Sequence, residues 1–273
     1  MSSLEIGDHE IPKAFSLLSV ERMAVLQQIT GNERDSLDLH HQMLIVAAAM
    51  MPVTAMIEIC LRNAVSDRLR PLFKTADWLQ SPPPPFEWRK IEKDKIRNAK
   101  RAAQRAVYAK KTQFEKRTLD RLAYPNGIPA NLSHKIRVNQ RQIQIQITVG
   151  QLVAQLTLGH WKRLFSSDYQ SLWDRSLKRI FSDRSTTRAG VAENLEVIHQ
   201  ARNRIAHHEL LYGPRLDTTV KAIDFIVGAF GPKSANSQTL LELMVKPHRL
   251  ALQVEADKLA ALVSKFTVSN VDQ

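Results

Sequence analysis

The sequence is nearly free of cysteine, with Cys60 as the single one among 273 residues. One cysteine excludes an internal disulfide framework and any metal site built from several thiolates. Cys60 lies within an apolar run, so we expect it to be a small core residue rather than a nucleophile. A chain that cannot form internal disulfides suits a reducing compartment, and we predict a cytoplasmic location.

Long apolar runs and leader signals are also lacking. The most apolar stretch, MLIVAAAMMPVTAMI at 43–57, is about 15 residues long, whereas a membrane span needs about 20. It contains Pro52 and runs directly into Glu58. We therefore predict a buried helix there and no membrane partner. The first 15 residues have neither the basic start nor the apolar middle of a signal peptide.

Glycine is scarce, with 9 residues, and alternation of apolar and polar residues is rare. Long stretches instead repeat apolar residues at helical spacing, which predicts an all-α protein. We expect a first helix over 14–30 and a long second one from about 33 to about 72, kinked at Pro52. The segment QIQIQIT at 142–148 is the exception, because its spacing fits either a short strand or the lead-in to the next helix.

A proline block, SPPPPFEW at 81–88, stops any helix and is typical of a stiff spacer. It suggests three parts. Residues 1–80 would hold the N-terminal helices of a bundle, residues 81–140 a Pro-rich linker and a basic helical insertion, and residues 141–273 the rest of the bundle.

Positive charge is in excess, with 39 Lys and Arg against 27 Asp and Glu, a net charge of +12. Between Arg89 and Arg121 there are 13 basic and 4 acidic residues, a net +9. Such a field attracts polyanions, of which nucleic acid is the commonest. We predict an amphipathic helix there that binds RNA, although a solvated helix face or a charge for solubility fits the same pattern. The predicted RNA-binding residues are Lys100, Arg101, Arg105, Lys110 and Lys111.

The segment HQARNRIAHHELLYG at 199–213 ends a predicted helix and contains three histidines, two arginines, an asparagine and a glutamate. On a helical wheel Arg202 falls in the same apolar stripe as Val191, Leu195, Ile198 and Ile205. A guanidinium cannot lose its proton and is costly to bury without an anionic partner. We expect a carboxylate to compensate it, with Glu58 of the second long helix as the candidate.

Several reactions are excluded at this segment. HHELLY is not the zinc-protease pattern HExxH, because Tyr212 takes the place of the second histidine, and we expect no metal. The chain has no G-x-S-x-G elbow, no P-loop and no G-x-G-x-x-G, so we expect no cofactor. What remains is an arginine, an amide and a histidine. Histidine transfers protons near neutral pH and arginine stabilises a phosphorane, which suits metal-free RNA cleavage by the 2′-hydroxyl. A purely structural role at a helix end is the alternative.

The same residues resemble a known family. ARNRIAHHELL resembles the R-N-x-x-x-H signature of HEPN domains, carried here by Arg202, Asn203 and His207. IEICLRNAVSDRL followed by DWL, and VAQLTLGHWKRLF followed by LW and IF, are similar to blocks of the Abi-like (AbiD/AbiF, abortive-infection) branch. The resemblance covers roughly residues 15–230. It departs where Leu158 and His160 replace two phenylalanines of the central block.

The resemblance implies an all-α HEPN-type bundle, here with a basic helical insertion and additional C-terminal helices. It implies a metal-independent endoribonuclease of a toxin–antitoxin or abortive-infection system, acting as a homodimer and controlled by an antitoxin protein or RNA. Arg202 would hold the scissile phosphate and His207 would transfer protons. Asn203 would orient the phosphate or the histidine. Glu58 would position Arg202, with Arg62 beside it.

Two other functions stay open at this point. Some relatives in the superfamily bind RNA without cutting it, so the chain fits a non-catalytic RNA-binding or regulatory protein. An interaction protein whose charge only keeps it soluble is the third reading.

Overall fold

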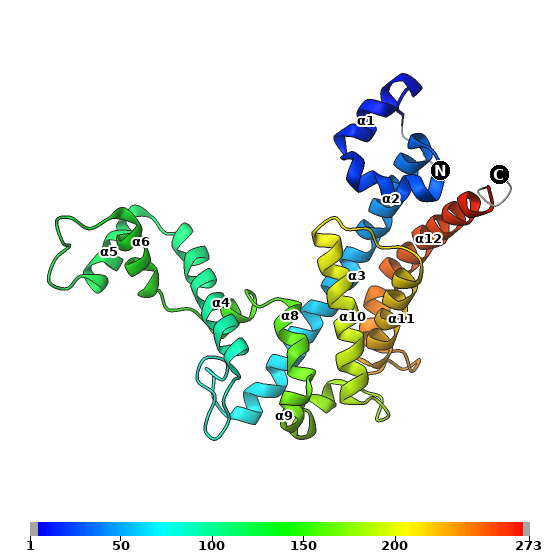
Figure 1. Cartoon of the computed structure of the whole chain (residues 1–273). Helices are drawn as coiled ribbons and strands as arrows, with labels where there is room; N and C mark the ends of the chain where they lie inside the picture. Colours follow the sequence, from blue (N-terminus) through cyan, green and yellow to red (C-terminus); the bar gives the residue numbers. More distant parts are fainter. Residues whose placement is uncertain (1–4, 270–273) are drawn as a thin grey trace. The chain divides into compact units, whose positions relative to one another are not determined.

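The structure is a computed structural model that describes residues 5–269, and all its regular elements in that range are helical (Figure 1). The only extended pairings among these residues are two isolated bridges, Phe181 with Phe230 and Lys233 with Thr239. The predicted all-α class is confirmed. It follows from apolar residues at helical spacing and from the near absence of alternating segments.

The chain divides into two compact units. The first contains residues 1–60 and 181–273, and the second contains residues 61–180. The division does not fall at the predicted boundaries after residues 80 and 140. Its first boundary lies inside α3 (Glu33–Phe73), one uninterrupted helix of 41 residues. A helix that continues through a boundary leaves no change in composition for the sequence to reveal.

The first unit is a helical bundle that includes the N-terminal part of α3, up to Cys60. In it α10 packs on α11, α11 packs on α12, and α12 packs on α2. Figure 1 shows α10, α11 and α12 running side by side. The other helices of this unit are α1 (Ile11–Leu17), α2 (Val20–Thr30), α10 (Arg188–Ala206), α11 (Pro214–Ala229) and α12 (Leu240–Ser269).

Local breaks in this unit differ from those expected. The single helix predicted over 14–30 is two helices, because Ser19 adopts a φ of 68° and caps α2 by accepting a hydrogen bond from the Arg22 backbone N–H at 3.2 Å. The two prolines within the long helices do not end them. The structure carries α3 past Pro52 and α12 past Pro247 without ending the helix.

The N-terminal part of α3 is apolar on two faces. Met43, Val46, Met50, Val53 and Ile57 are buried, but Leu44, Met51 and Ile59 are 44%, 42% and 40% exposed. Among the described residues α3 is the one helix long and apolar enough to cross a membrane, and 33% of its most apolar window is buried. The prediction of a buried helix is therefore correct for one face only.

The second unit contains the basic segment. The predicted helix over 89–121 is two helices, because the chain leaves the helix after Ala109 and restarts at Thr112, which forms a capping box with Glu115. Of the apolar residues at helical spacing in this segment, Ile96, Ala99 and Ala103 are buried and Val107 is half-buried. The unit begins with residues 61–73 of α3. Its other helices are α4 (Lys90–Ala109), α5 (Gln113–Ala123), α6 (His134–Ile143), α7 (Val149–Val153), α8 (Leu158–Trp161) and α9 (Gln170–Arg175), with short 3₁₀ turns after α8 and α9.

The proline block is not a free spacer. Trp88 is 3% exposed, and its indole N–H donates to the Leu79 carbonyl at 2.9 Å. The ring of Phe86 lies 4.9 Å from that of Phe73 and 4.8 Å from that of Trp88. Because these aromatic side chains pack together, the aromatic end of the segment belongs to the core of the second unit, whereas the four prolines are half-buried or exposed.

The QIQIQIT segment forms no strand in the described structure. Ile143 is the last residue of α6, and the chain then connects to α7. The Gln104 side-chain amide, from α4, donates to the carbonyls of Ile143 and Ile145 at 3.3 and 3.2 Å. These carbonyls thus bond to a side chain rather than to a neighbouring strand.

Candidate active site and nucleic-acid interface

The R-N-x-x-x-H residues lie at the C-terminal end of α10. Thr187 begins this helix by accepting a hydrogen bond from the Gly190 N–H at 3.1 Å. The predicted stripe is buried at Val191, Leu195, Ile198 and Ile205. Packing of this stripe holds the helix end in place, so the positions of Arg202, Asn203 and His207 are set by the core of the first unit.

The helical wheel predicted that Arg202 is buried with the apolar stripe, but Arg202 is less buried than the stripe residues. It is half-buried, and its guanidinium makes no hydrogen bond or ion pair with any residue that the structure describes. The expected pair with Glu58, which is also half-buried, is not formed. A long stem lets an arginine cover apolar surface while its charged end reaches water, so burial of its carbon atoms needs no carboxylate. Arg62 belongs to the second unit and is half-buried.

Asn203 pairs with a histidine outside the R-N-x-x-x-H motif. Its amide nitrogen lies 3.2 Å from Nε2 of His199, one helical turn earlier. The expected role of Asn203 was to orient a phosphate or His207. The i, i+4 spacing to His199 is the signal that could have predicted the observed pair.

His207 is the C-cap of α10, and its side chain is exposed. The helix ends in a Schellman motif, in which the N–H of His208 donates to Ile205 O at 3.0 Å and that of Glu209 donates to Arg204 O at 2.8 Å. His208 supplies the left-handed residue of this motif, with a φ of 56°. Backbone hydrogen bonds therefore fix the turn without the imidazole of His207, which makes no hydrogen bond within the described chain.

Two further contacts hold this helix end. Arg204 forms an ion pair with Glu209 at 3.2 Å, and the Arg22 guanidinium of α2 donates to the carbonyl of His208. Arg202 and His207 share no such contact. Five residues separate them, which corresponds to about 140° around an ideal helix. One chain thus offers one unpaired guanidinium and one exposed imidazole, attached at positions on different sides of the helix.

An apolar surface adjoins the motif. A groove of about 300 Å³ is lined by Met43, Leu44, Ala47, Ala48 and Met51 of α3 and by residues 205, 206 and 208–211 after the motif helix. Along α3 the exposed residues of this surface recur at spacings of three and four. We call them the α3 stripe: Leu44, Ala48, Met51, Ala55 and Ile59. Unpaired apolar patches of this kind mark association sites.

The predicted RNA-binding residues do not share one face. Lys100, Arg101, Arg105 and Lys110 are exposed and form no ion pair among the described residues, whereas Lys111 pairs with Glu115 at 3.0 Å. Measured around α4 from the buried Ala103, Arg101 and Arg105 lie about 160° away on either side, and so on the solvent face. Lys110 follows the last turn of α4 and lies beside a pocket. Two separate basic surfaces result.

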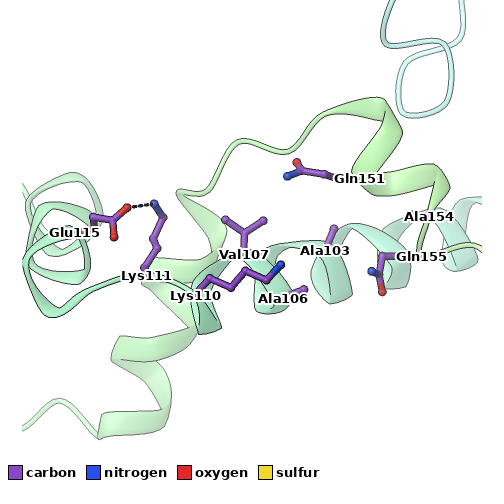
Figure 2. A pocket seen from close by; sticks show the side chains of 9 residues that line it. All are labelled: Ala103, Ala106, Val107, Lys110, Lys111, Glu115, Gln151, Ala154 and Gln155. Carbon is purple, nitrogen blue, oxygen red and sulfur yellow. Dashed lines mark hydrogen bonds and ion pairs between the residues drawn. The ribbon is translucent and has the colours of Figure 1, made fainter.

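That pocket, which we call the α4–α7 pocket, has a volume of about 440 Å³. Its walls come from α4, from the start of α5 and from α7 (Figure 2). The lining residues are Ala103, Ala106, Val107, Lys110, Lys111, Glu115, Gln151, Ala154 and Gln155. No sequence pattern indicates Gln151 and Gln155, because only the tertiary fold brings them to the end of α4.

No group of three or more His, Cys, Asp or Glu side chains close enough to hold a metal ion occurs among the residues described. Comparison of the chain with protein-family models, with curated proteins and with solved structures finds no match.

Proposed function

We propose that the protein is a metal-independent endoribonuclease of an abortive-infection or toxin–antitoxin system, and that it cuts RNA by attack of the 2′-hydroxyl. Arg202 binds the scissile phosphate and His207 transfers the proton. The products carry a 2′,3′-cyclic phosphate and a 5′-hydroxyl. The assignment of the chain to the Abi-like HEPN proteins, which the sequence resemblance suggests, is part of this proposal.

The proposal is best supported by the availability of Arg202 and His207, whose side chains form no hydrogen bond or ion pair within the described chain. A guanidinium without an internal partner and an exposed imidazole lie five residues apart, on a helix end that the core and the Schellman motif hold in place. Charged groups that the fold itself does not use are available for a phosphate. The net charge of +12 brings RNA to such a surface.

The geometry favours a site shared by two copies. Because Arg202 and His207 diverge around α10, one chain does not direct both at one phosphate. The α3 stripe adjoins the motif through the apolar groove, so a second copy packed on the stripe places a second Arg202 and a second His207 nearby. A homodimer is therefore part of the proposal, as is an antitoxin of protein or RNA that restrains it.

The decisive test incubates the purified full chain with end-labelled single-stranded RNA in the presence of EDTA. We expect cleavage by the wild type and a loss of at least about 100-fold in His207→Ala, which is the usual size of one general acid or base. His207 is exposed and its side chain makes no hydrogen bond, so the variant keeps the fold.

The matched control is His208→Gly, which removes the neighbouring exposed histidine. Glycine suits the left-handed backbone at this position, so this variant folds and retains cleavage. Cleavage that EDTA abolishes, or full activity in His207→Ala, contradicts the proposal.

A second candidate is a non-catalytic RNA-binding protein. It is favoured by the pairing of Asn203 with His199 and by the unpaired cations of α4. It predicts no cleavage by the wild type and RNA binding that survives His207→Ala. That binding weakens when Lys100, Arg101 and Arg105 are neutralised together.

A further inference from the structure

The α4–α7 pocket combines an apolar floor with polar edges. Ala103, Ala106 and Ala154 are too small to fill the space between α4 and α7, and Val107 adds a fourth apolar surface. The volume of about 440 Å³ is within the range of ligand sites, roughly 300–1,000 Å³. Such a floor offers van der Waals contact to a flat ring and no hydrogen bonds to its faces.

The charge of the pocket comes from one residue. The Lys111 ammonium is neutralised by Glu115 at 3.0 Å. Hydrogen bonds from the Thr112 backbone N–H and from Lys111 lower the pKa of Glu115 to about 2, so this carboxylate is ionised at neutral pH. Lys110 has no ion pair within the described residues. It therefore provides a single net positive charge at the rim.

Two amides provide hydrogen bonds at the edges. The Gln151 side chain accepts from the Thr148 N–H at 2.8 Å through its oxygen, which leaves its NH₂ group free to donate. Gln155 is exposed, and its side-chain amide makes no hydrogen bond in the described structure. Figure 2 shows Gln151 extending from α7 over the end of α4, where Lys110 runs back along the helix beside Ala106.

We propose that the α4–α7 pocket holds one unstacked base of single-stranded RNA, with Lys110 on the adjoining phosphate. A nucleobase is a planar ring with apolar faces and donor and acceptor groups on its edge, which matches the apolar floor and the two amides. Arg101 and Arg105, on the other side of α4, bind the backbone elsewhere. The inference rests on RNA as the ligand in the proposed function, but not on cleavage.

The test measures binding by the full chain carrying His207→Ala, so that cleavage does not interfere. The probes are a fluorescent 12-nucleotide oligoadenylate and an abasic RNA of the same length. The pocket is filled by the double substitution Ala106→Leu and Ala154→Leu, at two exposed positions where a larger side chain meets solvent rather than the core. The control is Arg105→Gln, on the opposite face of α4.

We expect the filled pocket to weaken oligoadenylate binding roughly tenfold, as the loss of one stacked base does, and to leave abasic RNA unaffected. Arg105→Gln weakens both probes alike. An equal loss for both probes in the leucine variant, unchanged binding of both, or no RNA binding by any variant overturns the pocket assignment. If base-dependent binding is seen but the wild type does not cleave RNA, the nuclease proposal fails and the pocket stands.

Discussion

At the residue scale, His160 is the polar side chain whose surroundings fit it least. It is 0% exposed, and neither ring nitrogen has a hydrogen-bond partner. Its ring packs edge-on against Trp161 at 4.9 Å and lies 6.5 Å from that of Trp88. Burial lowers the pKa of His160 to about 4, and the nearby Lys95 lowers it as well, although Glu92 opposes the shift.

The prediction at this scale concerns pH. The unfolded histidine binds a proton near pH 6.5 and the folded one only near 4, so acidification through this window favours the unfolded chain. Between pH 7.5 and pH 5 this one group removes about 2 kcal/mol from the free energy of unfolding. Urea denaturation at both pH values measures the loss. In His160→Phe the loss should be smaller by that amount, and an identical pH dependence in both proteins contradicts the assignment.

At the scale of elements, α3 shows that apolar periodicity predicts the extent of a helix but not which of its apolar faces is covered. Its apolar residues predict a helix of the observed length, and Met43, Val46 and Met50 form the expected buried face. The same pattern does not reveal that the opposite face, the α3 stripe, is left uncovered. Which apolar face packs internally depends on where α10 to α12 lie, and that is decided by the tertiary fold.

The stripe leads to a prediction about association. We expect the wild type to sediment as a dimer and Met51→Glu to sediment as a monomer, because a carboxylate desolvated on the stripe is costly. Met51 is 42% exposed, so the fold of the monomer should survive. Leu122→Glu on α5, where leucine is 60% exposed, is the control and should stay dimeric.

The same interface predicts the pattern of activity. Cleavage should fall with the dimer in Met51→Glu. Mixing inactive Arg202→Ala with inactive His207→Ala should restore part of the activity, since a heterodimer still pairs one Arg202 with the His207 of the other chain. A monomeric wild type, or a fully active monomer, contradicts the shared site.

At the scale of the whole molecule, positive charge is distributed unevenly. Ion pairs with carboxylates determine which of the cations are available to bind phosphate. Asp120 in α5 accepts hydrogen bonds from both Arg137 and Arg141 of α6, which lower the pKa of this carboxyl far below its usual value. Those two cations hold α5 on α6. By contrast, Arg101 and Arg105 have no carboxylate partner in the described chain, so they are free to bind phosphate.

RNA binding should therefore depend steeply on salt. A plot of log K against log salt concentration should lose about 0.7 in slope for each phosphate contact removed from single-stranded RNA. We expect the Arg101→Gln, Arg105→Gln double variant to lose about 1.4. Lys93→Gln, which removes a cation already paired with Glu87 at 2.8 Å, should leave the slope nearly unchanged. Equal slopes in all three proteins contradict binding through α4.

The sequence alone determined the helical class, the extent of α3, the buried stripe of α10 and the position of the basic segment, because each depends on local spacing and composition. It also singled out Arg202, Asn203 and His207. Only the tertiary structure decided their partners: Asn203 faces His199, and Arg202 is left without Glu58. The α4–α7 pocket, the uncovered α3 stripe and the burial of Trp88 after the proline block likewise required the fold. Contacts between residues distant in sequence depend on which helix surfaces pack together, and the periodicity within one helix does not predict its packing partner.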